Sequence, residues 1–306
     1  MLRYDDLQVF VHTSDSGSLS AAARQLEISP AVASAALKRL ESELEVRLFA
    51  RSTRSLRLTP EGAAFLLHAR ASLRSLEEGR RLLQGGKDQI AGVLQLSAPS
   101  DFGRNLLLPW LDEFQARYPQ LSLRLLLGDR VTDLYRQPVD VAIRYGAPAD
   151  SSLVALPLAP DNRRVLCAAP GYLAERGEPR QPDDLREHNC LLYQLGGRVH
   201  DRWAFQRGRR SLTLTVAGDR VCDDADVVRR WALAGKGLVY KSWLDVAEDV
   251  RAGRLRLLLP EWQGEATPMN LLCTHRAQLT RPVTLLRAFV RERCDALLAE
   301  APWTRN

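Results

Sequence analysis

Apolar residues recur at helical spacing through the first sixty residues, in short runs that polar breaks separate. The first run consists of Leu7, Phe10 and Val11. After it, Ser18 can cap a second helix, and Ser29 with Pro30 can start a third that extends to about residue 46. A hydroxyl at the cap and a fixed φ at the first position both favour helix initiation. The pattern therefore predicts three short helices.

A short hairpin and a long helix are expected next. The segment RSTRSLRLT alternates enough for the hairpin, and Thr59 with Pro60 forms another cap and first turn. From there to about Gly85 nothing interrupts a helix, whose heptad seam consists of Leu66, Ala69, Leu73, Leu76 and Leu83. A rod of roughly 35–40 Å with one apolar stripe predicts a dimerisation helix. The alternative is a long helix that packs on its own domain.

Beyond the hinge-like stretch GGKDQIAG, short apolar runs alternate with helical segments. The expected strands are 92–99, 121–128, 139–145, 164–170, 210–218, 236–242 and 269–275. The expected helices are 106–114, 171–177, 225–233 and 283–299. This alternation favours parallel α/β layers with both sheet faces covered. About 215 residues exceed what one such sheet usually needs, so two lobes are expected.

Composition places few limits on this picture. The 306 residues are 45% hydrophobic and 26% charged, with a net charge of +6 that permits a polyanionic partner. No signal-peptide pattern and no run of 18 apolar residues is present, so no membrane span is expected. The five cysteines are scattered, unlike a disulfide framework or a CxxC zinc site. We expect a cytoplasmic protein with no metal and no cofactor.

The helix at 29–46 has little side-chain bulk on one side. Projected on a wheel, the side that meets the preceding helix holds Val32, Leu37, Leu40 and Leu44. The opposite side holds Ala31, Ser34, Ala35 and Lys38. Two helices joined by a tight turn, the second with a bare outward face, are typical of a helix-turn-helix that enters the DNA major groove. The alternative is that the alanines pack against another helix.

Arginines cluster in the segment after this helix. Arg47, Arg51, Arg54 and Arg57 lie within eleven residues that contain no acid. Beside a groove-reading helix, such a hairpin can clamp phosphates or the minor groove. Residues 1–60 carry eight basic and seven acidic side chains, so this interpretation depends on where the arginines lie. The alternative is a solvated charged loop.

The segment from LQVFVHTSDSGSLSAAARQLE to RSTRSLRLTPEG resembles the winged helix-turn-helix of LysR-type transcriptional regulators. The matching residues are Gly17, Ser18, Ala22, Ala23, Ser29, Ser34, Leu40, Glu41, Leu48, Phe49, Arg51, Thr53, Arg54, Leu58, Thr59 and Gly62. Ala33 and Ala35 stand where bulkier or polar residues are common, and Glu45 replaces a usual glycine. We expect the two alanines to alter operator preference and Glu45 to alter only a helix end.

The resemblance extends across the chain and implies its architecture. It implies an all-α winged helix-turn-helix at 1–59, a linker helix and hinge at 60–88, and an effector-binding domain at 89–306 that resembles type 2 periplasmic binding proteins. That domain has two Rossmann-like α/β lobes. Lobe I covers 89–162 and 268–306, lobe II covers 163–267, and crossover strands lie near 163–168 and 268–273.

The same resemblance implies a sequence-specific DNA-binding transcriptional regulator that a small-molecule effector controls. Its partners are double-stranded DNA, further copies of itself (a dimer through the linker helix and then a tetramer) and RNA polymerase. The DNA-binding residues are expected to be Ser18, Ser29, Pro30, Ala31, Ser34, Ala35, Lys38, Arg51, Thr53 and Arg54.

The effector is expected in the cleft between the lobes, at strand ends and helix N-termini. The candidate residues are Ser100, Val131, Thr132, Arg144, Tyr145, Tyr193, Asp226 and Lys241. Ser100 follows a strand and precedes a helix, where its hydroxyl and free N–H groups can hold an anion. Asp101 would oppose an anion there, so Ser100 is the better candidate.

Two cations suggest the chemistry of the effector. Arg144 and Lys241 each end a predicted strand, and together they could pair with a carboxylate. An anionic small molecule is therefore the hypothesis. The alternative is that Arg144 forms a structural ion pair with Asp140 or Asp226, while Lys241 points to solvent.

Other classes of protein fit the sequence less well. The five histidines show no ligand spacing, and the chain has no GxSxG motif and no P-loop, so we expect no enzyme. A solute-binding protein would need a signal peptide and would not carry the N-terminal unit. An architectural DNA-binding protein would not need two further lobes.

Overall fold

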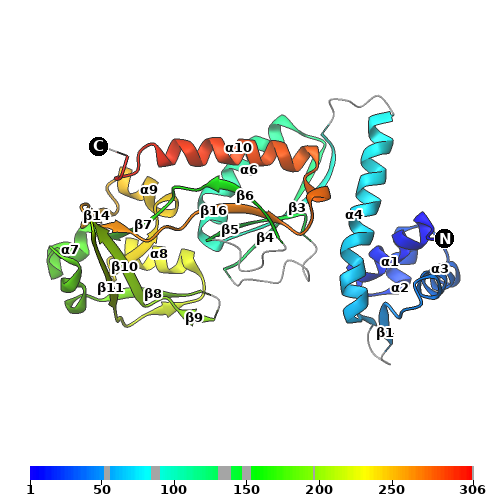
Figure 1. Ribbon diagram of the computed structural model, residues 1–306, viewed down its shortest axis with the longest axis horizontal. Coiled ribbons are helices and arrows are strands. Elements are labelled where there is room, and N and C mark those ends of the chain that lie inside the picture. Colours follow the sequence, from blue (N-terminus) through cyan, green and yellow to red (C-terminus); the bar gives the residue numbers. More distant parts are fainter. Residues whose placement is uncertain (52–55, 84–89, 130–138, 147–152, 196, 305–306) are drawn as a thin grey trace. The chain divides into compact units, whose positions relative to one another are not determined.

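The computed structural model describes residues 1–51, 56–83, 90–129, 139–146, 153–195 and 197–304. The chain divides into two compact units, one that contains residues 1–83 and one that contains the described residues from 90 onward (Figure 1).

The first unit contains four helices and a two-stranded hairpin among its described residues. Its elements are α1 (Tyr4–Ser16), α2 (Leu19–Gln25), α3 (Pro30–Glu43), β1 (Phe49–Arg51), β2 (Leu56–Leu58) and α4 (Pro60–Leu83). The expected caps form, since the Ser18 hydroxyl accepts from the Ala21 amide at 3.4 Å and the Ser29 hydroxyl accepts from the Val32 amide at 3.3 Å. Helix α3 ends three residues earlier than the sequence pattern suggests.

Phe10 lies at the centre of the core of this unit, where α1, α3, the hairpin and α4 meet. Leu66 and Ala69 of α4 are buried in this core, and Leu73 is half-buried against it. Leu76 is 59% exposed. The beginning of the long helix therefore packs on its own domain, whereas part of its expected heptad seam remains uncovered.

The second unit contains two α/β lobes, each built around its own sheet. Lobe I contains β3 (Gly92–Ala98), α5 (Ser100–Phe102), the π-helix η1 (Gly103–Leu107), α6 (Leu108–Arg117), β4 (Leu121–Leu127), β5 (Val141–Tyr145), β6 (Val154–Ala159), β16 (Met269–Cys273), η3 (Arg276–Gln278) and α10 (Arg281–Leu298). Its sheet has the order β4-β3-β5-β16-β6. The strands β4, β3 and β5 are parallel, and β16 runs antiparallel to both of its neighbours.

Lobe II contains the elements between β6 and β16. They are β7 (Arg164–Ala168), α7 (Pro170–Arg176), η2 (Pro182–Glu187), β8 (Cys190–Leu195), β9 (Arg198–Val199), β10 (Arg202–Arg207), β11 (Arg210–Thr215), β12 (Val221–Cys222), α8 (Ala225–Leu233), β13 (Leu238–Ser242), α9 (Trp243–Arg251), β14 (Arg256–Leu258) and β15 (Gln263–Gly264). The main sheet has the order β12-β8-β13-β7-β14, with β9 paired to β8. An antiparallel sheet, β11-β10-β15, accompanies it.

Both lobes depart from the predicted parallel layers, because their sheets are mixed. In lobe II, β8, β12 and β13 are parallel, whereas β7 and β14 run antiparallel to the strands beside them. The chain passes between the two sheets twice, after Ala159 and after Gly264. The ranges expected for crossover strands therefore correspond to β7 and β16, the first strand of the main sheets after each passage.

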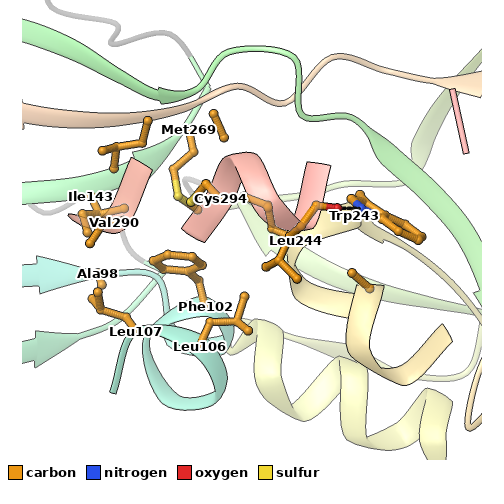
Figure 2. Close-up of a cluster of buried hydrophobic side chains, with 14 of the residues drawn as sticks. Ala98, Phe102, Leu106, Leu107, Ile143, Trp243, Leu244, Met269, Val290 and Cys294 are labelled. Atoms are coloured by element: carbon orange, nitrogen blue, oxygen red, sulfur yellow. Dashed lines mark hydrogen bonds between the residues drawn. The ribbon is translucent and has the colours of Figure 1, made fainter. Parts of the chain in front are cut away.

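One hydrophobic core spans both lobes. Figure 2 shows Phe102 of α5, Met269 of β16 and Val290 of α10 in this core, with Leu244 of α9 beside them. The Trp243 indole donates a hydrogen bond to the carbonyl of Leu297 at 2.9 Å. Packing of α10 against α9 thus joins lobe I to lobe II.

Candidate DNA-binding surface and interlobe site

Helix α3 presents a face with small side chains to solvent. Ala31, Val32, Ala35 and Lys38 are exposed, and Ser34 is half-buried. Val32 is 51% exposed, so its expected place on the inward side of the helix is wrong. Ala33 and Ala36 occupy the inward positions instead, and the outward face contains Val32 in addition to the predicted residues.

The inward alanines explain part of the low bulk of α3. Ala33 is fully buried and Ala36 is 2% exposed, in a cluster with Val9 of α1 and Ala23 of α2. Small residues here let the three helices approach closely. Ala33 therefore offers no exposed side chain to DNA, and its expected effect on operator preference stays a prediction. Ala35 is exposed, so the same expectation stands for that residue.

The other predicted DNA-binding residues lie around α2, α3 and the hairpin. Ser18 and Ser29 are helix caps, and the exposed Pro30 begins α3. Arg51 ends β1, whereas Thr53 and Arg54 lie outside the described residues.

The neighbour of Lys38 has a structural role. Arg39 donates to the buried Asp6 carboxylate of α1, with 2.6 Å between Nη2 and Oδ1, and this partner raises the pKa of the guanidinium. Lys38 forms no ion pair among the described residues, so it is the cation that α3 leaves available.

A buried carboxylate on α3 holds the start of the hairpin. One oxygen of Glu41 accepts from the amides of Leu48 at 2.9 Å and Phe49 at 3.2 Å. The other oxygen accepts from Arg47 at 3.0 Å. In the sequence, Glu41 is only one of the residues that match the LysR pattern. Its role is not apparent there, because the amides that it binds are seven and eight positions away. The bond also occupies Arg47, one of the four clustered arginines.

The first turn of α4 lies against the same segment. The Thr59 hydroxyl donates to the Arg47 carbonyl at 2.7 Å and accepts from the Gly62 amide at 2.9 Å. A Cβ atom on Gly62 would lie 2.0 Å from the Leu48 carbonyl oxygen. This close approach requires glycine and joins the hairpin to α4.

In the second unit, several predicted effector residues meet where the lobes face each other. Lys241, at the end of β13, is 2% exposed. Its ammonium group donates to the Asp101 carboxylate of lobe I and to the Ala225 carbonyl at 3.1 Å, and lies 3.3 Å from Asp245. Lys241 therefore neither points to solvent nor remains available to pair with an effector. It joins the two lobes.

The acids around Lys241 compete for one ammonium group. Burial raises the pKa of Asp101 to about 7, against the opposing effect of Lys241 and with a further increase from Asp245. Burial lowers the pKa of Lys241, but Asp101 and Asp245 outweigh it, so the net shift is upward. The Tyr145 hydroxyl donates to Asp245 at 2.5 Å, and burial and this carboxylate raise the pKa of the phenol.

Asp226 is also structural. It accepts from Asn105 of lobe I at 2.9 Å and from Arg230 at 3.0 Å. Next to it, Arg104 of lobe I donates to Asp224 at 2.9 Å. The beginning of α8 is therefore attached to lobe I by both neutral and charged hydrogen bonds.

Arg144 forms no hydrogen bond with an acid among the described residues. Its guanidinium donates to the Ser97 hydroxyl at 2.8 Å and to the Ile143 carbonyl at 2.7 Å, and burial lowers its pKa against the opposing effect of the nearby Asp129 carboxylate. Asp226 pairs with other cations, and the Asp140 carboxylate accepts from the Gln95 amide at 2.8 Å. The alternative structural ion pair with Asp140 or Asp226 is therefore not formed.

The remaining candidates lie in different surroundings. Ser100 is 1% exposed and binds Asp129 through its amide and its hydroxyl. Tyr193 is buried beneath the Arg164 guanidinium, which lies 5.2 Å from the ring centre. Val131 and Thr132 lie outside the described residues.

Comparison with known families decides what these two units are. Residues 4–63 match the bacterial regulatory helix-turn-helix protein, lysR family, and residues 87–295 match the LysR substrate binding domain. The chain belongs to the LysR family. It is therefore a DNA-binding transcriptional regulator with a domain for a small-molecule effector.

Named LysR-family relatives agree with this assignment. The Escherichia coli K12 regulator DmlR is 32% identical over 275 residues, which cover 90% of this chain and 88% of DmlR. The activator TtdR of the same organism is 32% identical over 283 residues, or 92% and 89% of the two chains. The structure of CrgA from Neisseria meningitidis, a LysR-type transcriptional regulator, is 31% identical, with a TM-score of 0.59 over 94% of this chain and 98% of CrgA. These relatives are named as regulators and not as enzymes.

The described part of this LysR-family chain shows neither a candidate membrane span nor a candidate metal site. None of its helices there is both long enough and apolar enough to cross a membrane. Those residues also contain no group of three or more His, Cys, Asp or Glu side chains arranged to hold a metal ion.

Proposed function

We propose that this LysR-type regulator binds its operator through the exposed face of α3 and the arginine-rich hairpin. Ala31, Ala35 and the half-buried Ser34 leave the α3 backbone accessible, and a major groove about 12 Å wide admits such a helix. Lys38 and Pro30 lie on the same exposed surface. In this account Ser18 and Ser29 position phosphates, and Arg51, Thr53 and Arg54 contact the DNA backbone or the minor groove.

We propose a small anionic molecule as the effector of the C-terminal domain. The observation that carries this proposal is Arg144, a half-buried guanidinium at the end of β5 that bonds only to neutral oxygens among the described residues. The Asp129 carboxylate interacts with the charge of Arg144 without a hydrogen bond to it. A ligand carboxylate can therefore supply the charge-assisted hydrogen bond that the described chain does not. Tyr145 is the last residue of β5, and Tyr193 lies in β8 of lobe II. We propose that both line the effector site.

We propose the domain boundaries 1–59, 60–88 and 89–306 for the DNA-binding, linker and effector parts. Leu76 is an exposed leucine on the long helix α4, and a second copy of α4 would cover it. Dimers formed in this way pair into a tetramer through the effector domains. Binding of the effector changes the geometry of the lobes, and this change alters both the bending of the DNA and the contact with RNA polymerase. We propose that the regulator acts in the cytoplasm.

Isothermal titration calorimetry with a panel of small organic acids tests the effector class. The Arg144→Ala variant should bind the responding acid about tenfold more weakly or worse, because a charge-assisted hydrogen bond is worth about 1.5–3 kcal/mol. Arg124→Ala is the matched control, since Arg124 is an exposed arginine on β4 of the same sheet. Equal affinity of the Arg144→Ala variant and the unmodified protein would exclude Arg144 as the anion anchor.

A further inference from the structure

Donor groups from both lobes converge on one internal carboxylate, that of Asp129. One oxygen of Asp129 accepts from the Ser100 amide at 2.8 Å. The other accepts from the Ala225 amide at 2.7 Å and from the Ser100 hydroxyl. Ser100 begins α5 in lobe I, and Ala225 begins α8 in lobe II. Asp129 follows β4, so a side chain of lobe I bridges to the positive end of a lobe II helix.

These donors are the ones that an anionic ligand between the lobes would use. Backbone N–H groups at strand-to-helix junctions, with a serine hydroxyl beside them, form an anion site. The next two amides of α8, those of Asp226 and Val227, already bind Asp224 at 2.9 and 3.4 Å. The first three amides of α8 therefore all have carboxylate partners from within the chain.

We propose that Asp129 is an internal competitor for the effector, and that its carboxylate occupies the position of the ligand anion and holds the lobes together in the absence of effector. An effector carboxylate binds by displacing Asp129 from Ser100 and Ala225. This inference rests on the proposed anionic effector for its regulatory meaning. The bridge from Asp129 to Ser100 and Ala225 is seen in the structure, and it can be tested without any effector.

Competition of this kind determines which acids can bind. An intramolecular carboxylate has a high effective concentration at its donors, so an acid that offers only a carboxylate cannot displace it. A successful effector must form additional contacts. Arg144 offers one, because its guanidinium bonds only to neutral oxygens in the described part of the chain. Asp129 therefore makes the site selective for acids that also reach Arg144.

Formate rescue of Asp129→Ala in the full-length protein tests the proposal. Removal of the carboxylate should lower the Tm by about 3–5 °C, because the Ser100 amide and hydroxyl lose this acceptor and the Ala225 amide keeps only the Ser100 hydroxyl oxygen, at 3.1 Å. Sodium formate should restore at least half of this loss in a saturable manner, relative to sodium chloride of equal concentration. The unmodified protein should gain nothing from formate. Asp112→Ala, which removes an exposed acid on α6, should behave like the unmodified protein.

Asp129→Asn retains the shape of the side chain and provides a second measurement if the alanine variant does not fold. Hydrogen exchange at the Ala225 amide should be roughly tenfold faster in this variant, because a neutral amide oxygen is a weaker acceptor than a carboxylate. Formate should not slow it, because the asparagine side chain fills the position of the carboxylate. The proposal is overturned if formate stabilises the unmodified protein as much as the Asp129→Ala variant, or if neither variant changes in Tm or exchange rate. Absence of any acid that binds the unmodified protein in calorimetry would instead refute the anionic effector, while formate rescue of the variant would still establish the bridge.

Discussion

At the scale of single residues, the departures from the LysR pattern have distinct structural consequences. Glu45 replaces a usual glycine just after α3, and it has a φ of 54°, in the left-handed region. Its backbone amide donates to the Ser42 carbonyl at 3.3 Å. The sequence alone predicted a changed helix end, and the structure shows the backbone conformation that makes this residue unfavourable there.

Glu45→Gly should therefore stabilise the first unit. A residue with a Cβ atom in the left-handed conformation costs about 1–2 kcal/mol relative to glycine, partly offset by the greater unfolded-state entropy of glycine. We expect the free energy of unfolding to rise by about 0.5–1 kcal/mol in chemical denaturation. Glu45→Ala is the control, because it removes the carboxylate but keeps the Cβ atom. An equal gain in both variants would assign the effect to charge instead of backbone conformation.

At the scale of elements, local signals predicted the helices well and the pairing of strands less well. The caps at Ser18 and Ser29 and the helix at 225–233 were found because the relevant residues are close in sequence. The antiparallel partners of β7 and the strand β10 were not found, because apolar runs do not specify direction or neighbours. The same limitation hid Glu41, which joins α3 to the hairpin across a distance in sequence.

Removal of the Glu41 carboxylate should loosen the hairpin. Glu41→Ala leaves the buried amides of Leu48 and Phe49 without an acceptor, and each such loss costs about 1–3 kcal/mol. We expect the unfolding free energy of the first unit to fall by about 3 kcal/mol, with a smaller loss for Glu41→Gln, whose amide oxygen can still accept. Glu43→Ala, at an exposed position on the same helix, should change it by less than about 0.5 kcal/mol. Equal values for the variants at 41 and 43 would contradict this role.

At the scale of the whole molecule, the sequence predicted two α/β lobes. It also predicted that residues from both lobes line a site between them. It did not predict that Lys241 is neutralised by Asp101, which lies 140 positions away, or that Ser100 binds Asp129. Such contacts depend on how the two lobes pack together, which local periodicity does not specify. The polar groups between the lobes are therefore mostly paired with one another, and Arg144 is the candidate that forms no hydrogen bond with an acid in the described part.

The central claim is that the exposed face of α3 binds operator DNA, and fluorescence anisotropy with the DNA upstream of the regulator's own gene tests it most directly. Ala35→Glu places a carboxylate on this face and should weaken specific binding by about 100-fold or more, because the side chain would meet the negatively charged groove. Ser122→Glu adds the same charge on β4 of lobe I and should leave affinity within about twofold. Unchanged affinity of a folded Ala35→Glu variant would contradict the claim that α3 enters the groove.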